Sequence, residues 1–157
     1  MPSYNQSTRL RVVDIGYGLR CEATTNPIVT GQNAVFNIIG GRVLLVDLVG
    51  IVTADLQAAA LLLHWDADMD IGGDAALSID SADLTGDVVG TQYLMPAAAG
   101  GAMTVPAGGA YLKLFPQIGW VLNTGALDLH ASASRTGGIK WTVWYYPLDD
   151  GAYIQAA

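Results

Sequence analysis

Charged side chains are scarce in this chain. Asp, Glu, Lys and Arg make up 13% of its 157 residues, about half the usual share of a soluble domain, whereas hydrophobic residues make up 52%. A monomer with so few charges covers its surface poorly, so the composition favours burial of a second surface in an oligomer or on a larger assembly. An unusually plain monomer is the alternative that the composition leaves open.

Basic residues are missing from a long central stretch. No Lys or Arg occurs from Val43 to Leu112, whereas nine Asp residues lie there, and the formal net charge is −7. Binding to a phosphate backbone requires clustered Lys and Arg, so we expect no direct nucleic-acid partner. Arg9, Arg11 and Arg20 suggest a mildly basic arm that contacts an acidic partner; three scattered, solvated arginines are the alternative.

Cysteine and catalytic motifs are also lacking. Cys21 is the sole cysteine, which excludes an internal disulfide, and we interpret it as a small buried or half-buried hydrophobe. His64 and His130 have no supporting Ser, Cys or metal-ligand motif, although a pair between His64 and Asp66 or Asp68 is conceivable. We therefore expect no enzymatic activity and no cofactor.

Long apolar runs are absent as well. The first residues, MPSYNQSTRLR, lack the apolar run of a signal peptide. The longest apolar stretches are too short or too interrupted to span a bilayer. We expect a protein without a membrane partner, synthesised in a cytoplasm.

What the chain does contain is a series of short segments with strand periodicity, separated by turn signals. They predict an all-β, single-domain β-sandwich, jelly-roll-like, over residues 33–157, after an extended N-terminal arm over residues 1–32 with one short strand near Leu10 to Ile15. LQAAALLLHW, Leu56 to Trp65, suits a helix or a strand, and we favour a strand. The other expected strands are Ala34–Ile39, Arg42–Thr53, Ala75–Asp80 (with Ala75, Leu77 and Ile79 inward), Gln92–Met95, Met103–Val105, Tyr111–Phe115, Ile118–Asn123, Leu127–Ser132 and Ile139–Tyr146.

The segment Arg42–Thr53, RVLLVDLVGIVT, is apolar on both of its alternating faces. A strand of this kind is covered on both faces, and only one cover comes from the opposite sheet. Asp47 interrupts one face. It either pairs with an arginine, accepts hydrogen bonds from backbone N–H groups, or lies near a strand edge and stays solvated. The two expected faces are Val43, Leu45, Val49 and Ile51, and Leu44, Val46, Leu48 and Val52.

The final strand, Ile139–Tyr146, alternates most clearly. Ile139, Trp141, Val143 and Tyr145 form the expected core face, and Lys140, Thr142, Trp144 and Tyr146 form the outer face. Two large aromatic side chains are rarely left in water by a small free domain. We therefore expect a protein interface over Trp144 and Tyr146; a sugar-stacking platform is the alternative.

The acidic stretch Asp66-x-Asp68-x-Asp70 is the best candidate for metal binding. Carboxylates at alternate loop positions can converge on Ca²⁺. The EF-hand pattern fails at Ile71 and Leu77, where it requires Gly and Glu. A calcium loop outside that pattern and a solvated acidic turn both remain open.

Three segments together carry a family resemblance: GQNAVFNIIGGRVLLVDLVGIVT, then AALSIDSADLTGD, then TGGIKWTVWYYPLDDGAYIQAA. Their strand–Gly-Gly–strand opening and their tryptophan-rich last strand with its Pro and DGA turn resemble small virion proteins of tailed bacteriophages. The resemblance covers roughly Thr30 to Ala157. It implies a β-sandwich that decorates or cements the outside of the phage head, often as a trimer, bound to the major capsid protein.

Such a role has no active site, so the resemblance assigns no individual residues. From the residues themselves we expect interface anchors at Trp144, Tyr146, Arg9, Arg11 and Arg20, because large aromatics and arginine dominate interfaces. The expected location is the capsid surface of the virion. A tail, baseplate or fibre component and a carbohydrate-binding β-sandwich module are the alternatives.

Overall fold

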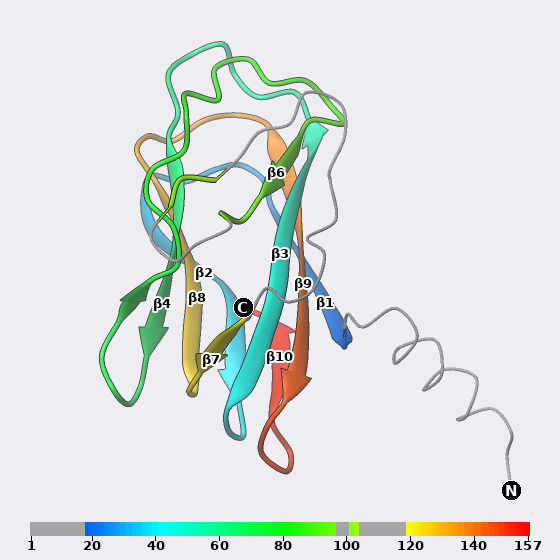
Figure 1. The fold of residues 1–157 in the computed structure, drawn as a ribbon. Helices are drawn as coiled ribbons and strands as arrows, with labels where there is room; N and C mark the ends of the chain where they lie inside the picture. The colour runs from blue at the N-terminus through cyan, green and yellow to red at the C-terminus, as the bar shows by residue number, and fades with distance from the viewer. Residues whose placement is uncertain (1–17, 97–100, 104–118) are drawn as a thin grey trace, which may run out of the picture.

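A computed structural model describes residues 18–96, 101–103 and 119–157, which contain ten β-strands and no helix (Figure 1). None of these residues therefore forms a helix able to cross a membrane. The strands are β1 (Leu19–Thr25), β2 (Gly31–Ile39), β3 (Val43–Ala54), β4 (Leu63–Met69), β5 (Ala75–Ala76), β6 (Gln92–Leu94), β7 (Trp120–Leu122), β8 (Gly125–Ala131), β9 (Gly138–Pro147) and β10 (Tyr153–Ala156).

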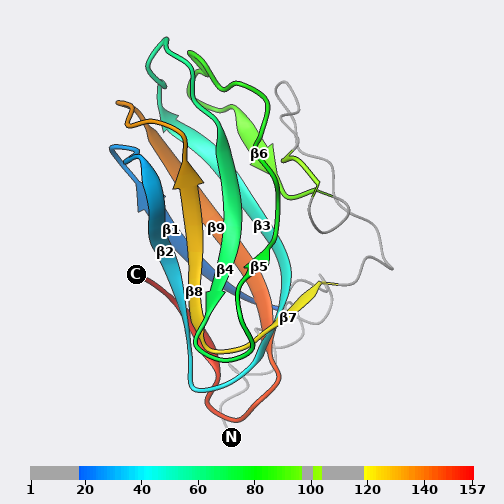
Figure 2. The same ribbon diagram turned by 90° about the vertical axis from the view of Figure 1, so that its left-hand side faces the viewer.

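The strands form two antiparallel sheets that face each other (Figures 1 and 2). One, here called the β9 sheet, has the order β1-β9-β3-β6, and β7 also pairs with β3. The other, the β8 sheet, has the order β10-β2-β8-β4-β5. The expectation of an all-β chain is confirmed.

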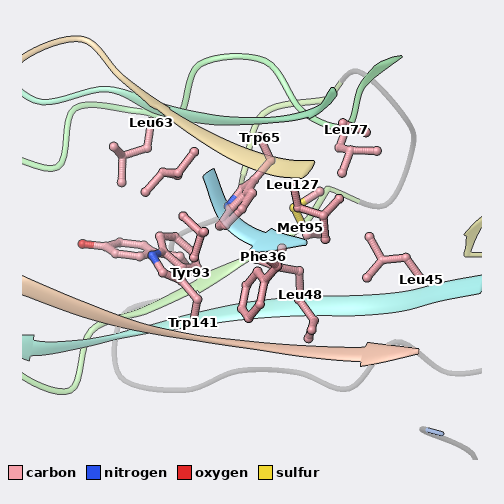
Figure 3. Close-up of a cluster of buried hydrophobic side chains, with 14 of the residues drawn as sticks. Phe36, Leu45, Leu48, Leu63, Trp65, Leu77, Tyr93, Met95, Leu127 and Trp141 are labelled. Atoms are coloured by element: carbon pink, nitrogen blue, oxygen red, sulfur yellow. The ribbon is translucent and has the colours of Figure 1, made fainter. Parts of the chain in front are cut away.

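Aromatic side chains from both sheets meet in the core (Figure 3). Trp65 of β4 and Trp141 of β9 are fully buried and pack edge to face, with ring centroids 5.0 Å apart. The ring centroid of Phe36 lies 6.3 Å from that of Trp65, and the ring centroid of Tyr93 lies 6.1 Å from that of Trp141. This cluster joins the two sheets, and the expected inward face of β9 (Ile139, Trp141, Val143 and Tyr145) is confirmed as core.

Gly50 makes room for this cluster in the middle of β3. It pairs with Trp141 on one side and with Tyr93 on the other. A Cβ at position 50 would lie 2.7 Å from Cε3 and 2.9 Å from Cη2 of Trp141. Glycine inside a strand often marks such a close approach.

The expected faces of β3 are wrong beyond Val46. The register with β9 shifts between Leu45 and Asp47, and this irregularity exchanges the two faces for the remainder of the strand. The fully buried face consists of Val43, Leu45, Leu48 and Val52, and the half-buried outer face consists of Leu44, Val46, Val49 and Ile51. At the shift, the backbone N–H of Leu48 donates to Asp47 Oδ1 at 2.9 Å.

The segment after β5 protects the edge of β4 with side chains. Ser78 Oγ accepts the N–H of Trp65 at 2.8 Å, and Ser81 Oγ accepts that of Leu63 at 3.1 Å. The expected strand Ala75–Asp80 is therefore only two residues long, with Leu77 buried and Ala75 and Ile79 exposed.

The strand expected over Leu56–Trp65 begins only at Leu63 and continues to Met69. The backbone of the preceding residues bonds to loops instead. Gln57 N donates to Thr136 O at 3.0 Å, and Leu61 N donates to Asp83 Oδ1 at 3.0 Å.

Part of the expected N-terminal arm lies in the sandwich. Leu19–Thr25 forms β1, which pairs along its whole length with β9. Cys21 is half-buried there and packs against the core, as expected, and burial raises the pKa of its thiol. The strands expected near Leu10–Ile15 and over Tyr111–Phe115, and residues 104–105 of another, lie outside the described residues.

An ion pair ties together two connections that pass between the sheets. Arg42 follows β2 and Asp149 follows β9. The Arg42 guanidinium bonds both carboxylate oxygens, at 3.0 and 2.8 Å, and its backbone N–H donates to Oδ2 at 2.7 Å. These hydrogen bonds lower the pKa of Asp149 to about 2.

We predict that Gly50→Ala lowers the free energy of unfolding by about 1–3 kcal/mol, because the added methyl group overlaps the Trp141 ring. Chemical denaturation measures this change. In a Trp141→Leu background the same substitution should cost less, because the overlapping ring atoms are gone. An equal loss in the free energy of unfolding in the two backgrounds would contradict the claim that Gly50 makes room for the Trp141 ring.

We predict that Asp149→Asn destabilises the protein at neutral pH and that the difference shrinks as the pH falls. A carboxyl whose folded pKa is lowered to about 2 contributes stability above its unfolded pKa of about 3.9 and loses it as the pH approaches 2. Denaturation of both proteins between pH 7 and pH 2 tests this. A pH-independent difference would show that the Arg42 contact is not electrostatic.

Candidate functional site

The outer face of the β9 sheet is apolar and aromatic. Here it is called the aromatic face and consists of Leu44, Val46, Val49 and Ile51 of β3, Val121 of β7, and Trp144 and Tyr146 of β9. All are half-buried except Val121, which is 61% exposed. Leu44 pairs with both Val121 and Tyr146, so these three side chains form one row across the sheet.

Charged residues border the aromatic face along β1. Arg20 pairs in register with Trp144, and its side chain is 60% exposed. Glu22 Oε1 lies 3.7 Å from Arg20 Nη2 and 3.4 Å from Lys140 Nζ, and it accepts the Thr142 hydroxyl at 3.4 Å. Exposed ion pairs contribute little to stability, so Arg20 can exchange Glu22 for a partner at low cost.

The structure therefore brings three of the five predicted interface residues, Arg20, Trp144 and Tyr146, onto one face. Arg9 and Arg11 lie outside the described residues. A patch of aromatic and aliphatic side chains with arginine at its border has the composition of a protein interface.

The outer face of the β8 sheet has the opposite chemistry. Here it is called the acidic face and carries carboxylates together with two histidines. His64 and His130 stack with ring centroids 4.3 Å apart. The carboxylates are Asp66, Asp68, Asp70, Asp74, Asp80 and Asp128.

His64 is held between two carboxylates. Its Nδ1 lies 2.6 Å from Asp80 Oδ1, and its Nε2 lies 3.2 Å from Asp66 Oδ2. The conceivable pair between His64 and Asp66 is thus present. Carboxylates therefore contact both ring nitrogens of His64.

Asp66 and Asp68 lie in β4, not in the calcium loop or the acidic turn that the sequence suggests; only Asp70 reaches the turn. Alternate residues on a strand are roughly 6.6 Å apart, so their carboxylates do not converge as Ca²⁺ requires. Within the described part of the chain no three acidic, His or Cys residues are placed to hold a metal ion.

Asp68 and Asp74 share a hydrogen bond across the β4–β5 hairpin. This bond and the charge of Asp74 raise the pKa of Asp68, and Asp128 and Asp70 add to the effect. Beside them is an open depression of about 330 Å³, lined by Asn37, Ile38, Ile39, Asp68, Asp70, Gly125 and Ala126.

Asp128 is the most unusual member of the acidic face. It is only 5% exposed, although Leu127 and Leu129 occupy the inward positions on either side of it. Gln32 Nε2 donates to its Oδ2 at 2.7 Å, while its Oδ1 and His130 Nδ1 are buried without a hydrogen-bond partner. The alternation of β8 predicts that Asp128 points outward, but not that neighbouring side chains cover it.

No protein-family model, curated protein or solved structure matches this chain.

We predict that Asp74→Asn lowers the pKa of Asp68 towards its ordinary value, because the neighbouring charge is removed. A carboxyl with a raised folded pKa destabilises the folded state above that pKa, so the variant should be more stable at pH 7 and lose this advantage as the pH falls. Carboxyl NMR titration and denaturation measure the two effects. Asp150→Asn is the control, and an unchanged Asp68 pKa in Asp74→Asn would contradict the coupling.

Proposed function

We propose that this chain is a structural protein of a tailed-bacteriophage virion, a decoration or cement protein that binds the major capsid protein on the assembled head through its aromatic face. The observation that carries the proposal is the aromatic face itself, where Trp144 and Tyr146 lie in an apolar patch bordered by Arg20. The resemblance of three sequence segments to such virion proteins supports it.

The chemistry of this face suits attachment to protein. Removing apolar surface from water contributes roughly 25 cal/mol per Å², which offsets the entropy that association costs. A protein that binds only the assembled head stabilises that state by mass action. We propose a homo-oligomer, a trimer by the same resemblance, because several modest contacts made together attach tightly.

We also propose a jelly-roll classification of the fold. A jelly roll is built from eight strands in two sheets. The strand orders β1-β9-β3-β6 and β2-β8-β4-β5 support this classification, with β7 and β10 as additions. Most pairs of consecutive described strands lie in opposite sheets, as the connections of a jelly roll require.

The proposal includes no catalytic role. A tail, baseplate or fibre location is the nearest alternative, since it uses the same kind of surface. A carbohydrate-binding module is the second alternative, in which Trp144 and Tyr146 stack on sugar rings.

We predict that Trp144→Ala weakens binding to purified heads by roughly tenfold or more, as the loss of an interface anchor does. Tyr153→Ala is the control, because Tyr153 is an aromatic residue with 43% exposure on β10 of the other sheet. Occupancy on heads is measured by sedimentation at graded protein concentrations, with circular dichroism to verify folding.

If Trp144→Ala and Tyr153→Ala occupied the heads equally, the aromatic face would not be the surface that binds them. Binding to purified tails but not to heads would favour the tail alternative. Binding to glycans that Trp144→Ala abolishes, with no binding to either particle, would favour the carbohydrate module.

A further inference from the structure

We propose that the acidic face binds the basic N-terminal segment of a second copy of this chain, with Arg9 and Arg11 contacting the carboxylates around Asp68. Such contacts between copies do not depend on the virion role.

The acidic face carries six carboxylates, and among the described residues its ion-pair contacts are limited to His64, which lies between Asp66 and Asp80. No Lys or Arg among the described residues forms an ion pair with any of its six carboxylates. The hydrogen bond that Asp68 shares with Asp74, together with the charge of Asp74, disfavours ionisation of Asp68. A bound cation would remove this repulsion.

Asp128 is a second, independent observation that points to a hydrogen-bond donor at this face. It is only 5% exposed, and no hydrogen-bond donor in the described structure contacts its Oδ1. Asp66 lies directly across from it on β4, and Asp68 is the next outward residue along that strand. Buried carboxylate oxygens are normally hydrogen-bonded, so an unsatisfied one beside two further carboxylates marks a place for a donor.

The spacing of the carboxylates suits arginine better than a metal ion. Ca²⁺ requires six to eight oxygens within about 2.6 Å, which alternate residues of a straight strand do not supply. A guanidinium has five N–H donors on a planar fork and bonds separate carboxylates at about 2.7–2.9 Å each. Gln32 is exposed and donates to Oδ2 of Asp128, so its hydrogen bond leaves Oδ1 without a donor.

The basic residues of the described sandwich are already engaged. Arg20 and Lys140 contact Glu22, Arg42 contacts Asp149, and Arg135 donates to the carbonyl of Ala60. Arg9 and Arg11 are separated by one residue, as are Asp66 and Asp68. In an extended segment the two arginines would point the same way, roughly 6.6 Å apart, which matches the two carboxylates.

The position of β1 favours a second copy as the donor. The N-terminal segment joins the sandwich at Gly18, beside Tyr145 and Tyr146 in the β9 sheet. The acidic face of the same copy lies on the outside of the opposite sheet, across the sandwich from that point (Figure 1). To reach the acidic face of its own copy, the N-terminal segment would have to pass around the sandwich. The acidic face of a neighbouring copy does not require this path.

The test compares the full-length protein with two sets of charge-reversal variants by sedimentation equilibrium at 50 mM and 500 mM NaCl. We expect wild-type protein to self-associate more tightly at low salt, because exposed charges are screened at high salt. Asp68→Lys should weaken association at least about tenfold, and the matched control Asp150→Lys less than about twofold. Asp68→Lys also removes the repulsion from Asp74, so it should remain folded.

The double variant Arg9→Glu/Arg11→Glu should lose association as Asp68→Lys does, and Arg9→Lys/Arg11→Lys should retain most of it. A mixture of Asp68→Lys with Arg9→Glu/Arg11→Glu should associate again, because each supplies the charge that the other lacks. Wild-type protein that is monomeric at 50 mM NaCl would overturn the proposal. So would association that is insensitive to salt, equal behaviour of Asp68→Lys and Asp150→Lys, or a mixture that stays dissociated.

Discussion

The packing of Trp141 over Gly50 and against Trp65 is the constraint on which the rest of the structure depends. It joins the two sheets through one edge-to-face contact at 5.0 Å and fixes the register of β9 against β3. Because side chains alternate along a strand, an inward Trp141 places Trp144 and Tyr146 on the outside. The core and the aromatic face are thus two consequences of one register.

The two outer faces divide the chemistry of the molecule. One is apolar and aromatic, with a border of exchangeable ion pairs around Glu22. The other gathers carboxylates and a stacked histidine pair, and it includes a buried oxygen of Asp128 without a donor. A chain with only 13% charged residues concentrates six of its fourteen acidic residues on that single face. Such segregation suits a protein that contacts different surfaces on opposite sides.

Sequence periodicity predicts the elements whose alternation is uninterrupted. It identifies both faces of β9 and the inward leucines of β8, because nothing in these strands disturbs the period of two. It fails at β3, where the irregularity near Asp47 exchanges the faces, since a bulge arises from pairing with a neighbouring strand. It also fails after β5, where Ser78 and Ser81 bond the β4 edge in place of a strand. The acidic face depends on which strands are neighbours, so local spacing offers only a calcium loop or a solvated acidic turn as alternatives.

The central claim is that this chain attaches to its assembly through the outer face of the β9 sheet. Hydroxyl-radical footprinting of the protein, free and bound to purified phage heads, tests it most directly. The account predicts protection of Trp144 and Tyr146 on binding, with Tyr153 on the opposite sheet equally reactive in both states. Protection of Tyr153 with unchanged Trp144 and Tyr146 would contradict it.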